Sequence, residues 1–591
     1  MMQNIIITLM VCMATLSAAV VGADFIPYPM KARHWMIGKG RRGARPKALD
    51  DASSTVSTGF FEVARPVDMP SESKLICTAP LIRSFLFKDT GESDPSTSQF
   101  APCTTEPFDR VVLRWRGTCS SRQFARISTL WMSGIELLRT STPEFANEGG
   151  SWSVDKDVTR FTCLFKTVRK VALQLNNVLD VDYSGFFNIS VYLDFYQTGT
   201  KRKYASPDLS VAPSHRIKAI SLPNPKDGGY WFHLGGDNPQ TISKEVVGIP
   251  RNPYRATIEI CLSAHNDEES WYTNPPTDYA NANNLTFGNG PFREVTVSID
   301  GTFVGSVWPF PLVLPGSFDP MAWRPVLPIG TATLPSYDLD ITPFVSLIND
   351  GNPHTITLTV VNSLSEWLVD ANLHLWVDSK VGATRAGLIS YNAPDFTPLD
   401  NSKFSGPNGD FYLSASRKYS FAGWVEDSKG NYTVCVSSLL TYSNALIMQG
   451  DYGYQSSDLT IAAQNQVLRY NDTLLIATYK TSSSFPFQIK CNQSDAANDS
   501  VNLNCAIAHG MTSDEFAIFE KGSFATSLNN TQLTSGQLTI NSDNTVSGAT
   551  GSLHQDYVYT GTSGCYQRAV STSNSAIVQD SFSTVCKPCR D

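Results

Sequence analysis

The chain is poor in the residues that most often carry metal and serine-nucleophile chemistry. Only eight of its 591 residues are histidine, and no two of them show a metal-ligand spacing on a helix. The sequence has no GxSxG, HExxH or Walker A motif, so the usual signals of a serine hydrolase, a zinc protease and a P-loop are absent. Chemistry therefore falls to carboxylates, arginines and aromatic side chains, and we expect no metal and no cofactor.

Positive charge is also scarce. The net charge is −8, which argues against a nucleic-acid partner because phosphate binding needs a basic face. With 41% hydrophobic and 17% charged residues the composition is typical of a globular protein. The length predicts two to four domains.

Long apolar runs are confined to the N-terminus. Residues from Ile5 to Val21 are apolar or small, and 21–23 resembles a small-residue cleavage site. We expect 1–23 to be a signal peptide and 24–58 to be a basic flexible or pro-segment; an uncleaved anchor is the alternative, although the run is short for a membrane span. The prediction is a protein that is secreted, or held in the lumen of the secretory or vacuolar system, with no membrane contact after cleavage.

The number of cysteines outside the predicted signal is odd. Twelve occur, and Cys12 lies in the signal, so at least one of the other eleven thiols stays free or pairs outside the chain. Cys163 and Cys261 lie among apolar residues, and either is a candidate for a buried thiol. Cys586 and Cys589 lack a matching Cys or His pair, so an oxidising compartment favours disulfides over zinc there.

Asn-x-Ser/Thr sequons agree with export, because behind a signal peptide several of them are used as glycosylation sites. The predicted sites are Asn188, Asn284, Asn431, Asn471, Asn492, Asn498 and Asn529.

Strand periodicity dominates from Phe60 to about residue 380. Apolar residues alternate with polar ones at 187–196, 294–299, 355–360 and 372–377. Asp300-Gly301 supplies a hairpin turn after the second of these runs. Many short strands with Gly/Pro turns predict an all-β fold of sandwich or jelly-roll type. From about 386 the composition becomes rich in Ser, Thr, Asn and Gly, which indicates a further β domain.

Aromatic residues and a run of acids form the clearest candidate site. Tryptophan faces stack on the apolar faces of sugars. The tryptophans considered are Trp131, Trp152, Trp231 and Trp271, with core packing as the alternative for each. Asp267-Glu268-Glu269 precedes Trp271 and Tyr272, and one of three adjacent acids beside aromatics can have a raised pKa and act as an acid or base. The alternative is a solvated acidic turn.

Short segments in a fixed order, spread over about 320 residues, resemble the peptide-N-glycosidase A family. They are FEVARP at 61–66, RQFARI at 122–127, GIELLRTST at 134–142, 152–159, 265–276 with DEESWY, GPFREV at 290–295, IDG at 299–301, PFP at 309–311, WRP at 323–325, LPSYDLD at 334–340 and DANLHLW at 370–376.

This resemblance implies hydrolysis of the amide bond between asparagine and the first N-acetylglucosamine of an N-glycan, on N-glycosylated peptides or proteins and without a cofactor. It also implies two antiparallel jelly-roll domains at 59–205 and 206–385, similar to bacterial peptide-N-glycosidase F, with the site between them. The segment 386–591 then forms a C-terminal β-rich accessory domain.

The resemblance also assigns the site residues. Glu269 and Arg126 are the catalytic candidates. The substrate-binding candidates are Trp131, Trp271, Tyr272 and Glu268. We expect Arg126 and Glu269 to face one cleft between the jelly-rolls.

One position departs from the family pattern. The family has Arg-Gln-Phe-Asp-Arg where this chain has Ala125 before Arg126, and that aspartate resembles the central catalytic carboxylate. A second family acid aligns loosely with Asn176. A methyl group cannot activate water, so we expect binding of N-glycopeptides with slow cleavage, unless Glu136 or Asp157 has taken over the role.

Three functions stay open from the sequence. The first is a glycoamidase weakened by Ala125, and the second is a catalytically inactive glycan-binding member of the same family. The third is a structural wall or surface glycoprotein, which rests only on the Ser/Thr/Asn-rich segment after 386.

Overall fold

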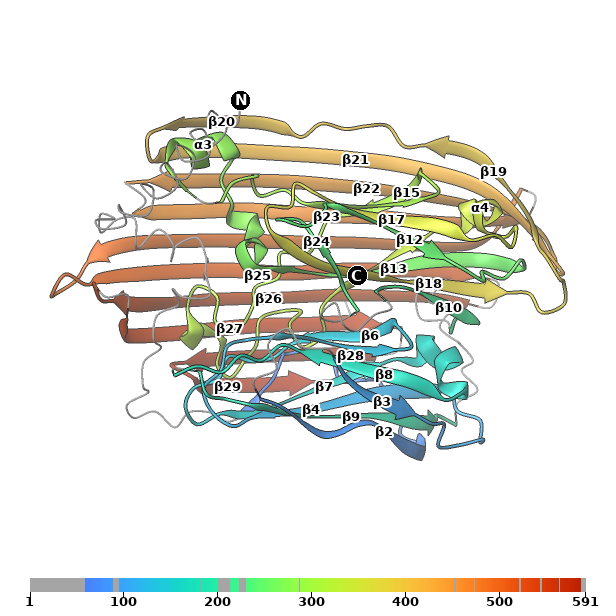
Figure 1. Ribbon diagram of the computed structural model, residues 1–591, viewed down its shortest axis with the longest axis horizontal. Coiled ribbons are helices and arrows are strands. Elements are labelled where there is room, and N and C mark those ends of the chain that lie inside the picture. The colour runs from blue at the N-terminus through green and yellow to red at the C-terminus, as the bar shows by residue number, and fades with distance from the viewer. Residues whose placement is uncertain are drawn as a thin grey trace, which may run out of the picture.

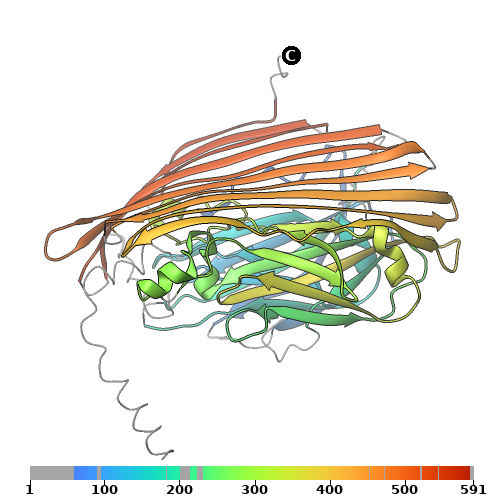
Figure 2. The same cartoon turned by 90° about the horizontal axis from the view of Figure 1, so that it is seen from above.

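The computed structural model describes residues 59–585, apart from 89–94, 182, 200–212, 223–229, 286, 451–452, 472, 520–521, 543–544 and 563. Two β-sandwiches lie side by side against one wide sheet of long strands (Figure 1), and the wide sheet forms a separate layer over both (Figure 2). The all-β prediction is confirmed. No helix within the described ranges is long and apolar enough to cross a bilayer. The predicted signal peptide, the basic segment and the Cys586/Cys589 pair lie outside the described residues.

The first sandwich is a jelly-roll by its strand order. One sheet runs β7-β4-β9-β2 and the other β3-β8-β5-β6, while β1 adds to β7 in parallel. This is the order of two interleaved Greek keys. The strands are β1 (Gly59–Phe60), β2 (Lys74–Phe87), β3 (Ser96–Phe100), β4 (Arg110–Cys119), β5 (Ile127–Met132), β6 (Ile135–Ser141), β7 (Gly150–Asp157), β8 (Arg169–Leu175) and β9 (Phe187–Gln197).

The second sandwich repeats the same order. Its sheets run β10-β18-β13-β16 and β12-β17-β14-β15, and β11 also pairs with β18. The prediction of two jelly-rolls is therefore confirmed by topology. The strands are β10 (Arg216–Ile220), β11 (Phe232–Leu234), β12 (Thr241–Val246), β13 (Pro253–His265), β14 (Glu294–Ile299), β15 (Thr302–Val307), β16 (Ser336–Asp340), β17 (His354–Val361) and β18 (Glu366–Val377).

The C-terminal part is a single eleven-stranded antiparallel sheet in which most strands pair with their neighbours in sequence. Its longest strand, β24, has 22 residues. The strands are β19 (Arg385–Asn392), β20 (Leu399–Ser405), β21 (Asn408–Asp427), β22 (Gly430–Gln449), β23 (Tyr454–Asn471), β24 (Leu474–Asp495), β25 (Val501–Phe519), β26 (Gly522–Ile540), β27 (Val546–Gly561), β28 (Gly564–Ser573) and β29 (Ala576–Ser583). We call this the large sheet.

Helices are few and short, and they lie in the connections. They are η1 (Thr159–Lys166), η3 (Asn266–Glu268), η4 (Trp271–Thr273), α3 (Thr277–Ala282), η5 (Pro320–Trp323), η6 (Thr342–Phe344) and α4 (Val345–Ile348).

The alternation read from the sequence matches the burial of the strands. On β9 the residues from Phe187 to Phe195 at every second position are buried, and Asn188 between them is half-buried. Asp300 and Gly301 both have positive φ, at 49° and 82°, and form the predicted turn between β14 and β15. On β18, however, the polar positions are buried too, because this face meets the first jelly-roll.

The described residues form two large hydrophobic cores and a small cluster around Trp131. One fills the first jelly-roll. The other is shared by the second jelly-roll and the large sheet, which contributes side chains such as Phe421, Tyr442 and Phe487. The large sheet therefore does not enclose a core of its own, and its inner face is stabilised by burial against the second jelly-roll.

Glycines let the large sheet approach the second jelly-roll closely. A Cβ on Gly551 of β27 would lie 2.4 Å from the backbone carbon of Met321, and one on Gly423 of β21 would lie 2.4 Å from Pro343 O. Only a residue without a side chain fits such contacts.

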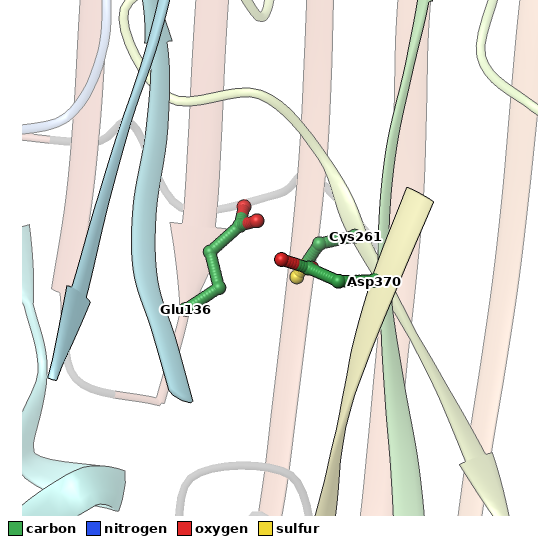
Figure 3. Close-up of side chains that lie close together, drawn as sticks. All are labelled: Glu136, Cys261 and Asp370. Carbon is green, nitrogen blue, oxygen red and sulfur yellow. The ribbon is translucent and has the colours of Figure 1, made fainter. Parts of the chain in front are cut away.

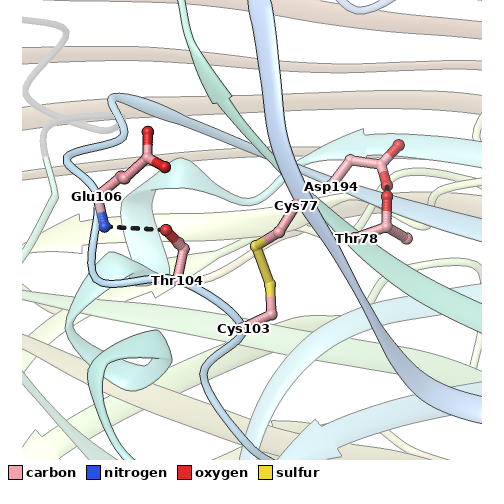
Figure 4. The surroundings of a disulfide bond; sticks show 6 residues. All are labelled: Cys77, Thr78, Cys103, Thr104, Glu106 and Asp194. Carbon is pink, nitrogen blue, oxygen red and sulfur yellow. Dashed lines mark hydrogen bonds between the residues drawn. A yellow bond between two sulfur atoms is a disulfide. The ribbon is translucent and has the colours of Figure 1, made fainter.

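Two disulfides are described. Cys77 and Cys103 join β2 to the segment after β3 (Figure 4), and Cys491 and Cys505 lie directly opposite each other on β24 and β25. The free cysteines in the described part of the chain are Cys119, Cys163, Cys261 and Cys435. Both candidates for a buried thiol are therefore free; Cys261 is buried, whereas Cys163 is half-buried.

The predicted glycosylation sites reach the surface. Six of the seven asparagines are exposed, and Asn188 is half-buried. On the large sheet, Asn431, Asn492 and Asn529 alternate with buried neighbours, which places them on the face that points away from the jelly-rolls.

Candidate active site

Ala125 and Arg126 lie on the connection from β4 to β5, at one end of the first jelly-roll. Gln123 and Phe145 exchange both backbone hydrogen bonds (3.2 and 2.9 Å), and Thr142 N donates to Arg126 O at 2.8 Å. Arg126 N donates to Thr142 Oγ1 at 2.9 Å. The position of Ala125 is therefore fixed on both sides, and its methyl group supplies neither an acid nor a base.

Glu144 lies on the segment that pairs with this position, although the sequence analysis missed it. The backbone pairing sets Glu144 opposite Phe124 and Pro143 opposite Ala125. Glu144 is buried, and its Oε2 lies 1.6 Å from the place that a Cβ on Gly316 would occupy. Because Gly316 belongs to the second jelly-roll, the Glu144 carboxylate lies at the junction of the two domains. Its only signal in the sequence is its place two residues after the family segment 134–142.

Glu136 and Asp157 do not take the place of an acid at 125. Ile127 pairs with Ser141 while Glu136 pairs with Trp131. Five residues therefore separate Glu136 from the end near Ala125, about 17 Å along the strand. On β7, Gly150 pairs with Cys119. Asp157 lies seven residues further along the same strand, which is about 23 Å from Gly150. The strand register therefore does not support the alternative that Glu136 or Asp157 has taken over the role of the aspartate.

Two aromatic rings that the sequence did not indicate, Phe124 and Tyr183, lie beside Arg126. The Arg126 guanidinium lies 5.6 Å from the centroid of Phe124, and its Nη2 donates to Gln123 Oε1 at 3.3 Å. Phe124 stacks on Tyr183 with 3.5 Å between ring centroids.

The segment of Asn176 is held against the same connection. Gln123 Nε2 donates to Val178 O at 3.2 Å and to Gly185 O at 3.1 Å. The two positions at which we expect acids in the family pattern, 125 and 176, therefore belong to adjoining segments.

Glu268 is a structural carboxylate. Arg293 donates to both of its oxygens, at 2.6 and 2.8 Å, and Trp367 Nε1 and Leu364 N each donate at 2.7 Å. Burial alone would raise the pKa of the Glu268 carboxyl, but the charge of Arg293 and these bonds outweigh burial and lower it. With four hydrogen bonds already accepted, Glu268 holds the fold together rather than offering an open site to a sugar.

Glu269 lies on the second jelly-roll, between η3 and η4, and is half-buried. It lines a cavity of about 30 Å³ together with Leu312 and Leu334. Ser141, which pairs with Ile127, donates its N–H to Thr331 O of the same 308–335 segment at 2.7 Å. Arg126 and Glu269 belong to different jelly-rolls, as predicted; that they face one cleft stays a prediction.

The aromatic candidates are buried. Trp131 and Tyr272 are fully enclosed, and Trp271 is 2% exposed. Trp131 Nε1 donates to Asp370 Oδ2 at 2.8 Å, and Tyr272 OH donates to Leu312 O at 3.2 Å. None of the three offers an open face for stacking, so core packing is the reading that the structure favours for them.

A charged cluster is buried where the jelly-rolls meet. Glu136 extends from β6, and Cys261 and Asp370 extend from β13 and β18 (Figure 3). Arg139 Nη2 lies 2.7 Å from Glu136 Oε2 and 3.5 Å from Asp370 Oδ1. Arg139 Nη1 also donates to Ser263 Oγ at 2.9 Å, so the cluster ties three strands of the two domains together.

Burial controls the protonation of this cluster. Burial, reinforced by the Glu136 carboxylate, raises the pKa of Asp370 well above its ordinary value despite Arg139. Burial and the surrounding carboxylates also raise the pKa of the Cys261 thiol. Metal ligands must be deprotonated, so a neutral thiol and an arginine-paired carboxylate make a poor metal site. The cluster fits an interdomain ion pair better than a metal centre.

A second cluster of buried polar and charged side chains lies beside the first. Glu259 Oε2 accepts from Asn372 at 2.9 Å and contacts His374 Nε2 at 3.1 Å, while Arg160 lies 3.4 Å from Oε1. Burial opposes the charge, but Arg160 and His374 hold the pKa of Glu259 well below its ordinary value. Asn372 and His374 come from the DANLHLW segment and alternate along β18 on the same face as Asp370.

The chain is similar to known proteins over most of its length. Residues 66–394 match the family model for peptide N-acetyl-beta-D-glucosaminyl asparaginase amidase A. A Prunus dulcis protein named peptide-N4-(N-acetyl-beta-glucosaminyl)asparagine amidase A is 34% identical over 552 residues, which are 92% of this chain and 95% of that protein.

Two solved structures are also similar to part of the chain, with low TM-scores. PNGase F of Flavobacterium meningosepticum covers 51% of this chain and 96% of its own, with 12% identity and a TM-score of 0.35. PNGF-II covers 51% and 65%, with 11% identity and a TM-score of 0.34. These scores are low, so the jelly-roll assignment rests on strand order. The family match and the almond relative show that the chain belongs to the peptide-N-glycosidase A family.

Proposed function

We propose that the chain hydrolyses the amide bond between asparagine and the innermost N-acetylglucosamine of N-linked glycans, leaving aspartate in the peptide. The observation that carries this proposal is the match to the almond amidase over nearly the full length of both chains. The substrates are N-glycosylated peptides or proteins, and a nucleic-acid partner is disfavoured by the net charge of −8.

The site of this reaction is the junction at 123–126, 142–145 and 316. Amide hydrolysis needs an activated water, stabilisation of the developing oxyanion and a proton for the leaving amine. Ala125 cannot activate water, and Glu144 lies on the segment directly opposite. We assign Glu144 the role of general base, in a less favourable position than an aspartate at 125 would have. Arg126 stabilises the oxyanion, and Glu269 supplies the proton to the leaving amine.

The test is a time course on one N-glycopeptide, with asparagine-to-aspartate conversion scored by mass. The native chain should cleave slowly. Ala125→Asp should raise the rate by about 10²–10⁴-fold, because a positioned general base contributes that much, and should change affinity little. Glu144→Gln should abolish the residual cleavage, while Glu148→Gln, an exposed acid four residues on, should leave it unchanged. Brisk native turnover with no gain from Ala125→Asp would contradict the assignment of position 125.

Ala125 also favours a second function, an inactive glycan-binding member. That reading predicts native affinity for the glycopeptide with no conversion, and no residual rate for Glu144→Gln to remove. Binding measured beside the time course separates the two functions.

We also propose that the protein is secreted or enters the lumen of the secretory or vacuolar system. The disulfides and the surface position of the sequons support this proposal. Mature protein should begin near residue 24 and lose mass on deglycosylation. Unprocessed, unglycosylated protein in the cytosol would contradict it.

A further inference from the structure

A groove separates the second jelly-roll from the large sheet, away from the junction at Ala125. Its volume is about 320 Å³, which lies within the usual range of ligand sites. One wall is formed by β15, β16 and Arg255 and Thr257 of β13, and the other by the inner face of β21–β25. We call it the β16 groove. Pro335 and Tyr337 also line the small cavity of Glu269, so this cavity adjoins the groove.

The floor of the β16 groove is a lateral row of short polar side chains. Ser438, Asn465 and Thr481 are direct cross-strand neighbours on β22, β23 and β24. Ser438 Oγ donates to Asn465 Oδ1 at 2.8 Å, and Asn465 Nδ2 donates to Thr481 Oγ1 at 3.3 Å. In the adjacent row Ser483 and Ser513 lie 3.4 Å apart. These residues share the face that carries the apolar core further along the same strands.

Ser438 of this row is buried, whereas Asn465 and Thr481 are open to the groove. Further along the same face, Tyr442 and Ile461 are buried in the shared core. At the groove, by contrast, Asn465 is exposed and Thr481 is half-exposed. Hydroxyl and amide groups that face an open space can exchange hydrogen bonds with a ligand at little desolvation cost.

The opposite wall supplies carboxylates and a further hydroxyl. Asp340 lies 3.5 Å from Arg255, and Asp338 lies 2.9 Å from Arg160. The hydroxyl of Thr257 is buried and has no hydrogen-bond partner among the described residues. An unpaired buried hydroxyl is costly, and a ligand that bonds to it removes this cost.

Charge and shape narrow the class of ligand. The charged residues that line the groove are one arginine and three carboxylates, Arg255, Asp338, Asp340 and Glu515, so phosphates and acidic glycans are repelled. Tyr337 and Tyr479 add aromatic surface, which suits the apolar faces of sugar rings. Hydroxyls, amides and carboxylates beside tyrosines match a ligand that is rich in hydroxyl groups and carries no charge.

We propose that the β16 groove binds a neutral oligosaccharide, as a second glycan site built by the large sheet. This site goes beyond the amidase reaction, because it holds glycan whether or not a bond is cleaved. Asn465, Thr481 and Asp338 hydrogen-bond to sugar hydroxyls, and Tyr479 packs on a ring face. The sequons at Asn431, Asn492 and Asn529 lie on the other face of the large sheet, so the protein's own glycans leave the groove open.

The test measures binding of a free neutral oligomannose N-glycan, which carries no peptide, to the full chain by calorimetry. The Asn465→Ala/Thr481→Val double variant should bind at least tenfold more weakly. The matched control is Gln464→Ala/Ser482→Ala, because Gln464 and Ser482 pair with each other on the same two strands and face outward. The control should bind like the native chain, and equal affinity of the inner variant would overturn the proposal.

Two further measurements keep the outcome clear. A photoreactive form of the same glycan should label peptides from β23–β25 in the native chain, and labelling confined to 123–145 would overturn the site even if the inner variant fails to fold. An unglycosylated peptide that competes for the label would show a peptide groove instead. Glycopeptide cleavage measured in parallel separates the two proposals. Intact cleavage without groove binding rejects only the groove, and binding without cleavage rejects only the amidase.

Discussion

At the scale of single residues, burial decides which carboxylates serve structure. Glu268 and Arg293 are both fully enclosed. Arg293 donates to both carboxylate oxygens of Glu268, at 2.6 and 2.8 Å. Removing one partner of a buried ion pair leaves the other charge uncompensated, which costs far more than the net contribution of the pair.

Glu268→Gln should therefore lower the free energy of unfolding by about 3–5 kcal/mol. The measurement is the midpoint and slope of urea unfolding. Glu106→Gln, an exposed acid, is the control and should change stability by less than about 0.5 kcal/mol. A loss below about 1 kcal/mol for Glu268→Gln would show that the pair is not important for stability.

Asp319 predicts how stability depends on pH. Its Oδ1 accepts from Met321 N at 2.9 Å, whereas Oδ2 is buried and lies 1.6 Å from the place of a Cβ on Gly536. Burial raises the pKa of Asp319 from 3.8 to about 7, although Met321 N, Arg324 and Ala322 N lower it. Between pH 4 and pH 7 the folded state therefore holds this proton while the unfolded state has released it.

This contribution to stability is complete below pH 4 and is lost as the pH rises through about 7. A shift of this size corresponds to about 4 kcal/mol at most. The loss of stability between pH 4 and pH 8 should be smaller in Asp319→Asn than in the native chain. Asp514→Asn, on the exposed face of β25, should keep the native pH dependence. Parallel curves for the native chain and Asp319→Asn would refute this.

At the scale of elements, close contact between η5 and β27 joins the second jelly-roll to the large sheet. A Cβ at Gly551 would meet backbone atoms of Met321 and Ala322, at 2.4 and 2.5 Å, and backbone cannot turn aside as a side chain can. Gly551→Ala should therefore cost about 1–3 kcal/mol. Gly548→Ala, on the same strand, meets only Thr539 at 3.3 Å and is the control. Equal thermal midpoints would show that the two layers separate easily here.

The strands that could be predicted were those with a local signal. On β9 and β17 the period-2 pattern identifies the buried face directly, and Asp300-Gly301 marks its own turn. β18 has the same alternation, but its polar residues face the first jelly-roll instead of water. That difference depends on Arg139 and Glu136, which lie more than 200 residues away in sequence, so no local pattern contains it.

The candidate site could be predicted only where a motif carried it. Arg126 and Glu269 were found through their segments, and they do lie on different jelly-rolls. Glu144 was missed because its relation to Ala125 comes from the pairing of 123–126 with 142–145. Trp131 and Trp271 are of a residue type that often stacks on sugars, but side chains from distant strands enclose them. The sequence could not distinguish stacking on a ligand from packing in a core.

At the scale of the whole molecule, the second jelly-roll depends on the large sheet. They share one hydrophobic core, and residues such as Phe344 and Trp308 pack on Phe421 and Tyr442. A chain that ends before Arg385 should expose this surface, because nothing else in the described part of the chain covers it.

That truncated chain should aggregate and bind a hydrophobic dye. Size-exclusion chromatography and dye fluorescence check this against the full chain. A chain that lacks residues 24–58 is the control for altered length. It should elute like the full chain, without aggregates. A truncated chain that stays monomeric and unfolds cooperatively would show that the jelly-rolls are self-sufficient.

The C-terminal position of the large sheet has a consequence for biosynthesis. The jelly-rolls leave the ribosome first, and about 200 residues must follow before their cover is complete. At about 5–20 residues per second this takes roughly 10–40 seconds, which is long compared with the time that an exposed apolar surface needs to find a wrong partner. Each strand of the large sheet pairs mainly with the one made just before it, so the cover can be added strand by strand onto a finished template. We therefore expect the nascent chain to need a chaperone during that interval, and to lose the need once β29 has been made.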